Sequence, residues 1–228
     1  MGQVPYVIVG DGKVARHFRR YFSHLKIGFS DWQNKPTEKC RAVLVLISDS
    51  AIESFIEANR HLFAPNQLFV HFSGSLYTEL AVGLHPLMTF SAKTDSYSYQ
   101  VYEQIFFIGE KGRASFPEIF PELPNRFIEI EPAQKPLYHA LCVVSGNFTT
   151  ILWQEVMRMF QKLQLPSDAL GPYLEQIFKN LLTNPDQALT GPIARKDCDT
   201  IRKNLKALEG SALQDIYAAF VKMKGLSI

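Results

Sequence analysis

The residue types with the most specific chemistry lie near the start of the chain, in the run GDGKVA. This run fits the pattern G-x-G-x-x-A, which binds the pyrophosphate of a dinucleotide between a strand and a helix. Gly10 would permit the sharp turn, Gly12 would let a phosphate approach the backbone, and Ala15 would let the next helix lie close to the sheet. The alternative is a turn that only packs helix on strand. We expect cofactor contacts from Gly10, Asp11, Gly12, Lys13, Val14 and Ala15.

Ser30 and Asp31 follow about twenty residues after the first glycine, where a dinucleotide fold contacts the adenosine ribose. The carboxylate of Asp31 could accept hydrogen bonds from the ribose hydroxyls of NAD. Ser30 together with Lys35 could instead bind the extra phosphate of NADP. A surface turn explains both residues as well. The choice between NADP and NAD therefore stays open at this point.

Two further polar turns are expected at the same edge of the sheet. Ser48 and Asp49 follow the apolar run AVLVLI, and Ser73 and Gly74 follow QLFVHF. In a doubly wound sheet these turns lie beside the cofactor, where Ser73 and Gly74 could offer a hydroxyl and a backbone N–H. Capping of the next helix would explain Asp49, and we favour capping for that residue. A tight turn explains Ser73 and Gly74 almost as well.

His85 precedes Pro86 at the end of an expected strand. A histidine can give a proton to a substrate carbonyl or take one from an alcohol, because its ordinary pKa lies near neutrality. It could instead only cap the strand. Asn147 follows Gly146 inside a long helical pattern, where both residue types have poor helix propensity. Asn147 could hold a substrate oxygen, or it could serve a contact with a crossing helix.

Arg195 lies in the turn that Gly191 and Pro192 begin. Its guanidinium could bind a substrate carboxylate as a fork. An ion pair with Asp197 or Asp199 is the alternative that we favour. Asp197 is also expected to cap the helix that follows it.

The elements that must position these residues are predicted from the apolar patterns. A β-branched run at 7–9 gives the first strand, and an amphipathic helix follows it. We expect further strands at 25–29, 42–47, 67–72, 81–85, 104–108 and 126–130, and helices at 51–60 and 116–123. The polar, tyrosine-rich segment 88–102 predicts a flexible loop near the site.

Beyond residue 131 the chain becomes helical. Helical spacing of apolar residues predicts a long spine at 136–163, followed by helices at 170–182, 197–208 and 211–222. We therefore predict an α/β protein with a Rossmann-type doubly wound sheet in residues 1–131. An all-helical substrate and dimerisation domain would follow in residues 132–228, with a cleft between the two.

The amino-acid composition limits the kinds of molecule that this protein is expected to bind. The net charge of +2 and the scattered basic residues give no case for nucleic acid or an anionic membrane surface. The three cysteines have neither metal-ligand nor disulfide-framework spacing, which suits a reducing compartment. The first residues read as a strand and not as a signal peptide, and no apolar run reaches membrane-spanning length. We expect a cytoplasmic protein that acts on a small molecule without a metal.

Six motifs in order carry a family resemblance: GDGKVA, LVLISDSAI, HFSGSL, LHPLMTF, YHALCVVSGNFTTIL and ALTGPIARKD. Together they resemble small two-domain Rossmann-like proteins that are named as NADP oxidoreductases of the deazaflavin-coenzyme-dependent type. Their helical C-terminal domain has no known function. The chain is more distantly similar to the superfamily of 6-phosphogluconate dehydrogenase, ketopantoate reductase and pyrroline-5-carboxylate reductase. The segment HPL also resembles the HPM of prephenate dehydrogenases, whose histidine is catalytic.

The resemblance implies a C-terminal domain like that of 6-phosphogluconate dehydrogenase, a homodimer formed through it, and a slight preference for NADP. It supports Gly10, Gly12 and Ala15 as cofactor contacts and His85, Ser73 and Asn147 as residues of the active site. Two positions depart from the family pattern, because Lys196 replaces a glycine and Asn204 replaces a frequent histidine.

Three functional hypotheses follow. The first is an NAD(P)-dependent oxidoreductase that transfers hydride to or from a small carbonyl, imine or hydroxy compound in the cleft, with His85 as proton relay and Ser73 and Asn147 orienting substrate. The second is a non-catalytic protein that senses a dinucleotide or binds a partner, which the departures at Lys196 and Asn204 favour. The third is a structural dimer with an empty turn.

Overall fold

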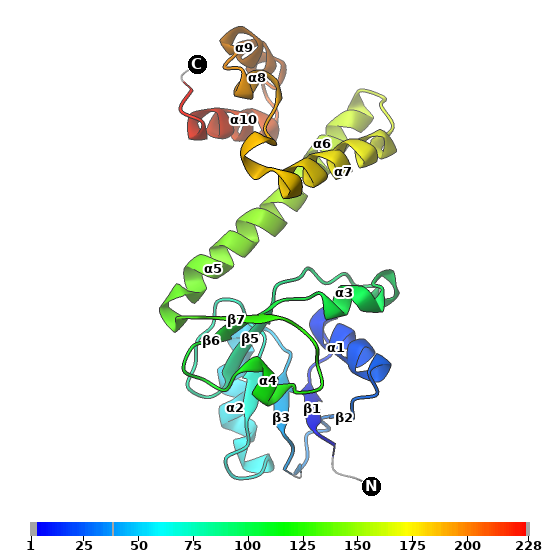
Figure 1. Cartoon of the computed structure of the whole chain (residues 1–228), viewed down its shortest axis with the longest axis vertical. Coiled ribbons are helices and arrows are strands. Elements are labelled where there is room, and N and C mark those ends of the chain that lie inside the picture. Colours follow the sequence, from blue (N-terminus) through cyan, green and yellow to red (C-terminus); the bar gives the residue numbers. More distant parts are fainter. Residues whose placement is uncertain (1–3, 38, 227–228) are drawn as a thin grey trace. The chain divides into compact units, whose positions relative to one another are not determined.

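The computed structural model describes residues 4–37 and 39–226. The chain forms two compact units, of which one ends at Asn147 and the other begins at Phe148 (Figure 1). The first unit contains a β-sheet and its covering helices, and the second is helical. The domain boundary expected after residue 131 stays a prediction.

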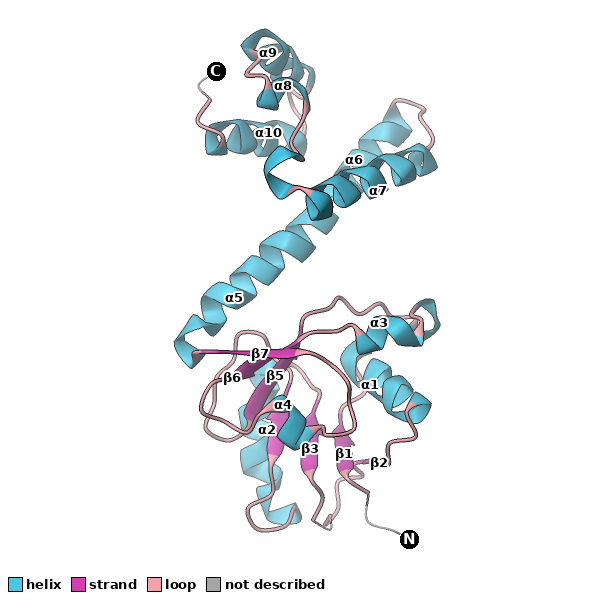
Figure 2. Cartoon of the chain, viewed as in Figure 1, coloured by secondary structure: helices cyan, strands magenta, loops and turns pink. Residues whose placement is uncertain are grey.

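Seven strands of the described chain form one sheet in the order β2-β1-β3-β4-β5-β6-β7 (Figure 2). Neighbouring strands are parallel, except that β5 and β6 run antiparallel. This sheet and the helices after it confirm the predicted fold class. The strands are β1 Tyr6–Val9, β2 Phe29–Asp31, β3 Ala42–Val45, β4 Phe69–His71, β5 Val82–Pro86, β6 Phe107–Glu110 and β7 Phe127–Ile130.

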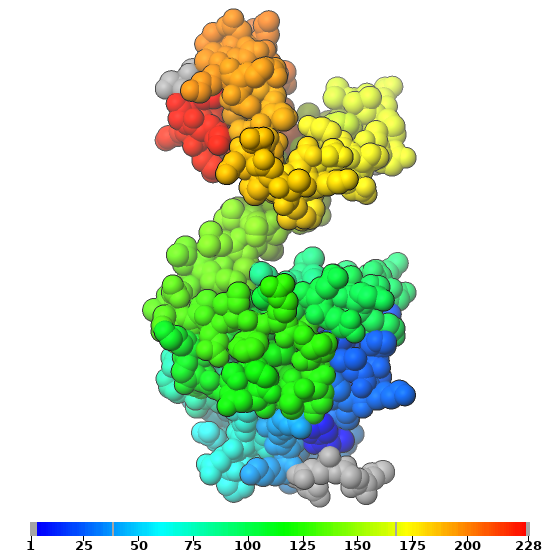
Figure 3. Space-filling model, in the orientation of Figure 1, coloured from blue at the N-terminus to red at the C-terminus, as the bar shows by residue number. Residues whose placement is uncertain are grey.

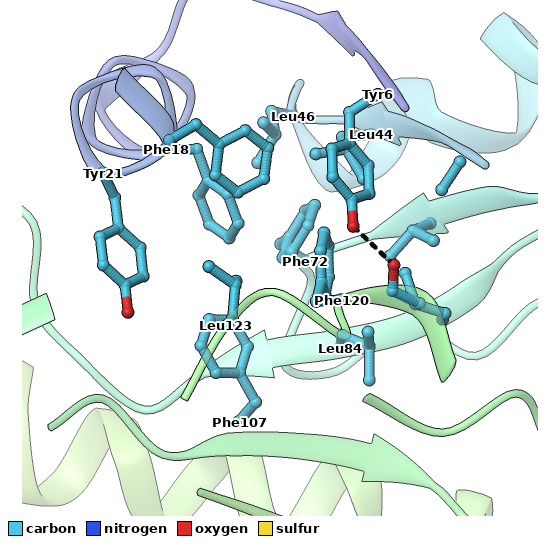
Figure 4. Packing of buried hydrophobic residues seen from close by; sticks show 14 of the residues in the cluster. Tyr6, Phe18, Tyr21, Leu44, Leu46, Phe72, Leu84, Phe107, Phe120 and Leu123 are labelled. Atoms are coloured by element: carbon cyan, nitrogen blue, oxygen red, sulfur yellow. Dashed lines mark hydrogen bonds between the residues drawn. The ribbon is translucent and has the colours of Figure 1, made fainter. Parts of the chain in front are cut away.

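The central strands are buried on both faces, as their continuous apolar runs require. Alternate residues point to opposite sides, so Tyr6 and Leu44 face one core while Val7 and Val43 face the other. Aromatic rings fill much of the first core (Figure 4), where the Tyr6 hydroxyl donates to the Ile119 carbonyl at 2.8 Å. The residues of this unit form one continuous body in the space-filling view, coloured from blue to green (Figure 3).

Helices cover both faces of the sheet. The apolar side of α1 packs into the first core through Phe18 and Phe22, and α2 packs into the second through Ile52 and Ile56. Tyr102 of α3 and Phe116 of α4 also belong to the first core. The helices of this unit are α1 Lys13–His24, α2 Ile52–Asn59, α3 Tyr99–Glu103, α4 Phe116–Ile119 and α5 Lys135–Cys142.

Two local predictions are wrong. The second strand was expected at 25–29, but β2 begins at Phe29 because the end of α1 uses the preceding residues: Lys26 has a φ of +56° and the Ile27 N–H donates back to the Phe22 carbonyl. The segment 88–102 was expected to be a flexible loop, but it holds a short 3₁₀ helix and most of α3. It is anchored because His17 of α1 bonds both the Tyr102 hydroxyl and the Ser91 carbonyl.

The long helix predicted at 136–163 is present as a nearly continuous helical run with one irregularity. Between α5 and α6 lies the π-helical segment Val143–Phe148, which includes the Ser-Gly-Asn sequence with poor helix propensity. The helices of the second unit are α6 Thr149–Lys162, α7 Leu170–Thr183, α8 Gly191–Ala194, α9 Cys198–Ala207 and α10 Ala212–Met223. None of the helices described is both long and apolar enough to cross a membrane.

Candidate functional site

The glycine turn lies between β1 and α1, and its two glycines have different reasons to lack a side chain. Gly10 has a φ of +105°, and a Cβ atom there would collide with the carbonyl oxygen of Leu46 beside it. Gly12 has an ordinary φ of −68°. The nearest atom to a Cβ on Gly12 would be the same Leu46 oxygen at 4.0 Å. Gly10 is therefore required by the turn, whereas Gly12 leaves open space in front of the backbone.

The start of α1 faces this space with backbone N–H groups that have no acceptor among the described residues. Gly12 is the N-cap residue, no side chain caps the helix, and its first turn contains no acidic residue. Free N–H groups and the positive end of the helix dipole make such a position attractive to an anion. Ala15 is fully buried against the sheet, which lets α1 lie close to β1 and β3 as predicted.

A cavity of about 470 Å³ opens at the carboxyl ends of β1, β3 and β4. It is lined by the turn residues 11–14, by residues 45–49 after β3, and by Phe72 and Ser73 after β4. The strand order places β2 and β3 on opposite sides of β1, so the cavity lies at the point where the order reverses. Open α/β sheets bind ligands at this point. The structure thus brings together Asp11, Gly12, Lys13, Val14, Ser48, Asp49 and Ser73.

The Arg19 side chain of α1 ties the glycine turn to β2. It donates to the Gly10 carbonyl at 2.7 Å, pairs with the Asp11 carboxylate at 3.1 Å, and pairs with Asp31 at 2.7 Å. Asp31 is the last residue of β2 and not part of a turn after it, and Ser30 lies in the same strand. Neither residue lines the cavity. Nothing in the sequence distinguishes Arg19 from Arg16 and Arg20 on the same helix.

Ser73 holds the turn after β4 through three hydrogen bonds. Its hydroxyl donates to the Asp49 carboxylate at 2.5 Å and accepts from the backbone N–H groups of Ser75 and Leu76. The favoured prediction for Asp49, a side-chain cap on the following helix, is wrong: Asp49 caps neither the 3₁₀ turn nor α2, because its carboxylate bonds to Ser73.

His85 lies near the end of β5 and contacts Tyr138 of α5. Its Nδ1 atom is 2.6 Å from the Tyr138 hydroxyl. A Cβ atom on Gly74 would come within 3.2 Å of the other ring nitrogen, Nε2, and within 2.6 Å of the His139 ring. Burial, reinforced by His139 and Lys135, lowers the pKa of His85 to about 4. The premise that this histidine titrates near neutrality is therefore wrong, since the folded protein holds it neutral at physiological pH.

A buried ionic cluster lies next to this pair. The Lys135 ammonium is 2.5 Å from the Glu110 carboxylate, whose other oxygen accepts from the Gly83 N–H at 3.1 Å. His71 is fully buried beside them, with Nδ1 accepting from the Ser73 N–H at 3.2 Å and Nε2 at 3.9 Å from Glu110. Burial, then the positive charge of Lys135, lowers the pKa of His71 to about 3. Sequence reasoning missed this cluster, although a histidine inside the apolar run QLFVHF was a signal of burial.

The remaining candidates take no part in these contacts. Asn147 is exposed on the π segment. The favoured ion pair of Arg195 with Asp197 or Asp199 does not form at contact distance among the described residues, since Asp199 pairs with Arg202 at 2.6 Å and Asp197 caps α9 by accepting from Thr200. The N-cap role of Asp197 is thereby confirmed. The hydrogen bonds from Thr200 lower the pKa of Asp197, and the Arg195 charge still helps to lower it. At the two departures from the family pattern, Lys196 has a φ of +55° and Asn204 donates to the Tyr217 hydroxyl at 3.1 Å.

Comparison with known proteins places this geometry in context. The model of a family described as a domain of unknown function, DUF2520, matches residues 109–223. No curated protein matches the sequence. A Bacteroides fragilis protein, BF3122, provisionally named an NADP oxidoreductase, has a TM-score of 0.81 at 19% identity, covering 97% of this chain and 98% of its own.

Two further solved structures extend the likeness. Protein TM1727 of Thermotoga maritima has a TM-score of 0.73 at 22% identity, with 96% of each chain covered. The pyrroline carboxylate reductase of Plasmodium falciparum, solved with NADP bound, has a TM-score of 0.56 at 12% identity, again with 96% of each chain covered. At these identities the likeness shows a shared fold, that of NAD(P)-binding oxidoreductases.

Proposed function

The chain belongs to the family of the domain of unknown function DUF2520, and from this premise we propose that it is an NAD(P)-dependent oxidoreductase. Bound NAD(P) donates or accepts a hydride, and the reaction partner is a small carbonyl, imine or hydroxy compound. The fold is shared with NAD(P)-dependent oxidoreductases, which supports the cofactor class and leaves the substrate to experiment.

The observation that carries the proposal is the open space in front of Gly12. A Cβ atom there would have no neighbour closer than 4.0 Å, and the uncapped start of α1 faces the same space. A pyrophosphate group fits this arrangement because it can approach the backbone and accept hydrogen bonds from the free N–H groups. Lys13 lines the same cavity and adds a positive charge.

Three residues are proposed to serve the substrate. His85 faces it with Nε2 beside Gly74, the residue next to Ser73 of the cavity wall. Ser73 shapes that wall, since its hydroxyl already bonds to Asp49 and to two backbone N–H groups. Asn147 remains a proposal from sequence, with its exposed amide placed to hold a substrate oxygen.

We further propose that NADP is preferred to NAD. An arginine near the end of the second strand can bind the 2′-phosphate that distinguishes NADP. The Arg19 side chain reaches this end of β2 from α1, and its ion pair with Asp31 offsets the repulsion that the carboxylate would exert on the phosphate. Asp31 without Arg19 would favour the ribose hydroxyls of NAD.

Calorimetric titration with NADPH and NADH tests the proposal. The wild-type protein should bind NADPH with a saturable heat, and Gly12→Ala should weaken that binding at least tenfold while the thermal unfolding midpoint stays the same. Gly171→Ala is the matched control, because a Cβ atom there meets nothing within 4 Å. A wild-type protein that binds neither nucleotide would overturn the proposal.

A screen for NADPH oxidation with keto acids and cyclic imines separates catalysis from sensing. Turnover of any member supports the oxidoreductase. Binding of NADPH without turnover across the screen favours the second candidate function, a dinucleotide sensor, which the departures at Lys196 and Asn204 motivate.

We also propose that a second copy of the chain covers the helical unit. In the described residues from Phe148 on, three hydrophobic residues are buried, Leu170, Ile201 and Val221. Large apolar side chains on α7 stay exposed instead, among them Tyr173, Phe178 and Leu182 at 63, 62 and 71%. The interface of an obligate homodimer is apolar like the core of a single domain, which matches the exposed apolar side chains on α7.

Light scattering after gel filtration tests the association. The wild-type protein should have twice the chain mass, and Phe178→Asp should halve it. Lys179→Asp on the same helix is the control and should leave the dimer intact. A monomeric wild-type protein at micromolar concentration would contradict this proposal without bearing on the cofactor.

A further inference from the structure

Tyr138 makes the closest polar contact of His85. Its hydroxyl lies 2.6 Å from Nδ1, the two rings meet edge to face at 76°, and the bond joins residues 53 positions apart. A neutral imidazole has one nitrogen that donates and one that accepts, so this single contact can decide where the ring proton lies. A phenol is the stronger donor of the two groups, and an imidazole nitrogen is the stronger acceptor.

The same pairing occurs elsewhere in the chain with its proton position fixed. The Nδ1 atom of His17 is 2.7 Å from the Tyr102 hydroxyl, and its Nε2 atom is 3.0 Å from the Ser91 carbonyl. A carbonyl only accepts, so Nε2 of His17 carries the proton and Tyr102 donates to Nδ1. His17 and Tyr102 therefore show which partner donates when a tyrosine meets Nδ1 in this fold.

The other nitrogen of His85 faces the turn that follows β4. Nε2 has no hydrogen-bond partner among the described residues, and it lies beside Gly74, where a Cβ atom would come within 3.2 Å of it. Gly74 follows Ser73, which together with Phe72 lines the cavity of about 470 Å³, while Gly74 and His85 line a smaller hollow with Lys135 and Tyr138. A glycine at this position leaves room for the rings of His139 and His85, which lie where a side chain would be.

We propose that Tyr138 is a positioning residue that fixes the proton of His85 on Nε2, so that the neutral imidazole presents an N–H donor to the substrate. This inference rests on the proposed oxidoreductase function, because that function is what provides a substrate for His85. It assigns His85 the role of a neutral donor to a carbonyl oxygen or imine nitrogen. A neutral imidazole can polarise such a group by hydrogen bonding without being an imidazolium.

The charges around His85 agree with a neutral ring. Lys135 and His139 face it from α5 and disfavour a second proton, while the charge of Asp49 favours it. Burial outweighs Asp49 and lowers the pKa of His85 to about 4. An arrangement that relied on imidazolium would be lost at neutral pH, whereas an N–H donor on a neutral ring persists there.

Long-range ¹H–¹⁵N correlation NMR of the histidine rings tests the proposal directly and needs no substrate. His71 supplies an internal reference, because its Nδ1 accepts a backbone N–H and its proton must lie on Nε2. In the wild-type protein His85 should give the same pattern as His71 from about pH 6 to 8. Tyr138→Phe should turn the His85 signals into those of a mixture of both tautomers.

Cys142→Ala is the matched control. The thiol of Cys142 on the next turn of α5 is the competing partner of the Tyr138 hydroxyl. Its removal should leave the His85 pattern unchanged if Tyr138 donates to Nδ1. A His85 proton on Nδ1 in the wild-type protein, an imidazolium pattern at pH 7, or a pattern unaffected by Tyr138→Phe would each overturn the inference.

NADPH titration of the same samples keeps the two proposals apart. Tyr138→Phe should bind NADPH within about twofold of the wild type, since Tyr138 lies outside the cavity lining. A fixed Nε2 proton in a protein that binds no dinucleotide would leave the positioning role intact and remove the proposed function. Binding of NADPH to a protein whose His85 proton lies on Nδ1 would overturn the positioning role and leave the proposed function intact.

Discussion

The hydroxyl of Ser73 donates a 2.5 Å hydrogen bond to the carboxylate of Asp49, 24 positions earlier in the chain. The bond joins the turns that follow β4 and β3 at the wall of the cavity. The same hydroxyl accepts from two backbone N–H groups, so it stabilises its own turn as well.

Ser73→Ala should therefore lower the free energy of unfolding by about 1–2 kcal/mol, because it leaves backbone donors and a carboxylate without their partner. Urea denaturation measures the loss. Ser75→Ala, an exposed position in the same turn, is the control and should change the midpoint little. Equal midpoints for the two variants would show that the Ser73 bonds contribute nothing.

Gly83→Ala should be among the more damaging small substitutions in the sheet. The new methyl group would collide with the Glu110 carboxylate and lie 2.5 Å from the Lys135 ammonium, so the buried pair would have to separate. Disturbing a buried ion pair without replacing it costs about 2–4 kcal/mol. Gly171→Ala in α7 should instead raise stability by up to about 1 kcal/mol, since alanine is the better helix former. Guanidinium denaturation compares the two, and a Gly83→Ala protein as stable as the wild type would contradict the packing described.

Stability should fall as the pH drops below about 6.5. His71 and His85 have pKa values lowered from 6.5 to about 3 and about 4 in the folded chain, so between those values and 6.5 the unfolded chain binds more protons. Each histidine then removes up to about 1.4 kcal/mol per pH unit, and the loss continues until the folded pKa is reached. Urea denaturation at about pH 7.5 and pH 5 measures the slope.

His71→Asn isolates the contribution of His71 to this loss of stability. An asparagine oxygen can still accept the Ser73 N–H but does not titrate in this range. The variant should show a shallower loss of stability in acid than the wild type. The same slope in both proteins would mean that His71 is not held neutral by the fold.

Arg19 should control cofactor selectivity. Arg19→Gln should weaken NADPH binding at least tenfold and NADH binding less, because the guanidinium is the proposed partner of the 2′-phosphate. Asp31→Asn should shift selectivity toward NADPH by removing the carboxylate from the same position. Arg16→Gln, which alters the neighbouring exposed arginine, should leave the NADPH-to-NADH ratio unchanged. Calorimetry gives all the constants, and an unaltered ratio in Arg19→Gln would rule out its role.

The glycine turn shows what the sequence could predict. The roles of Gly10 and Ala15 follow from residue size and from position between a strand and a helix, and both roles are local. Apolar runs likewise marked all the strands except β2, whose three residues are too few to outweigh the helix end before them. The fold class needed only these local patterns and their order.

The contacts around His85 could not be predicted in this way. Tyr138 is 53 positions from His85, and Lys135 is 25 positions from Glu110, so no spacing in the sequence joins them. Their burial depends on how α5 packs on the ends of β5 and β6. The change in the pKa of His85 follows from that burial, which explains why the expected near-neutral titration was wrong.

The π segment Val143–Phe148 has a consequence for changes in chain length. A π turn accommodates one residue more than an α turn, so deletion of one residue there can be absorbed by conversion to ordinary α-helix. The same deletion inside α6 would rotate the residues on either side by about 100° relative to each other and misalign its apolar face. This stretch is thus the point along the spine where the helix can be shortened by one residue and still run unbroken.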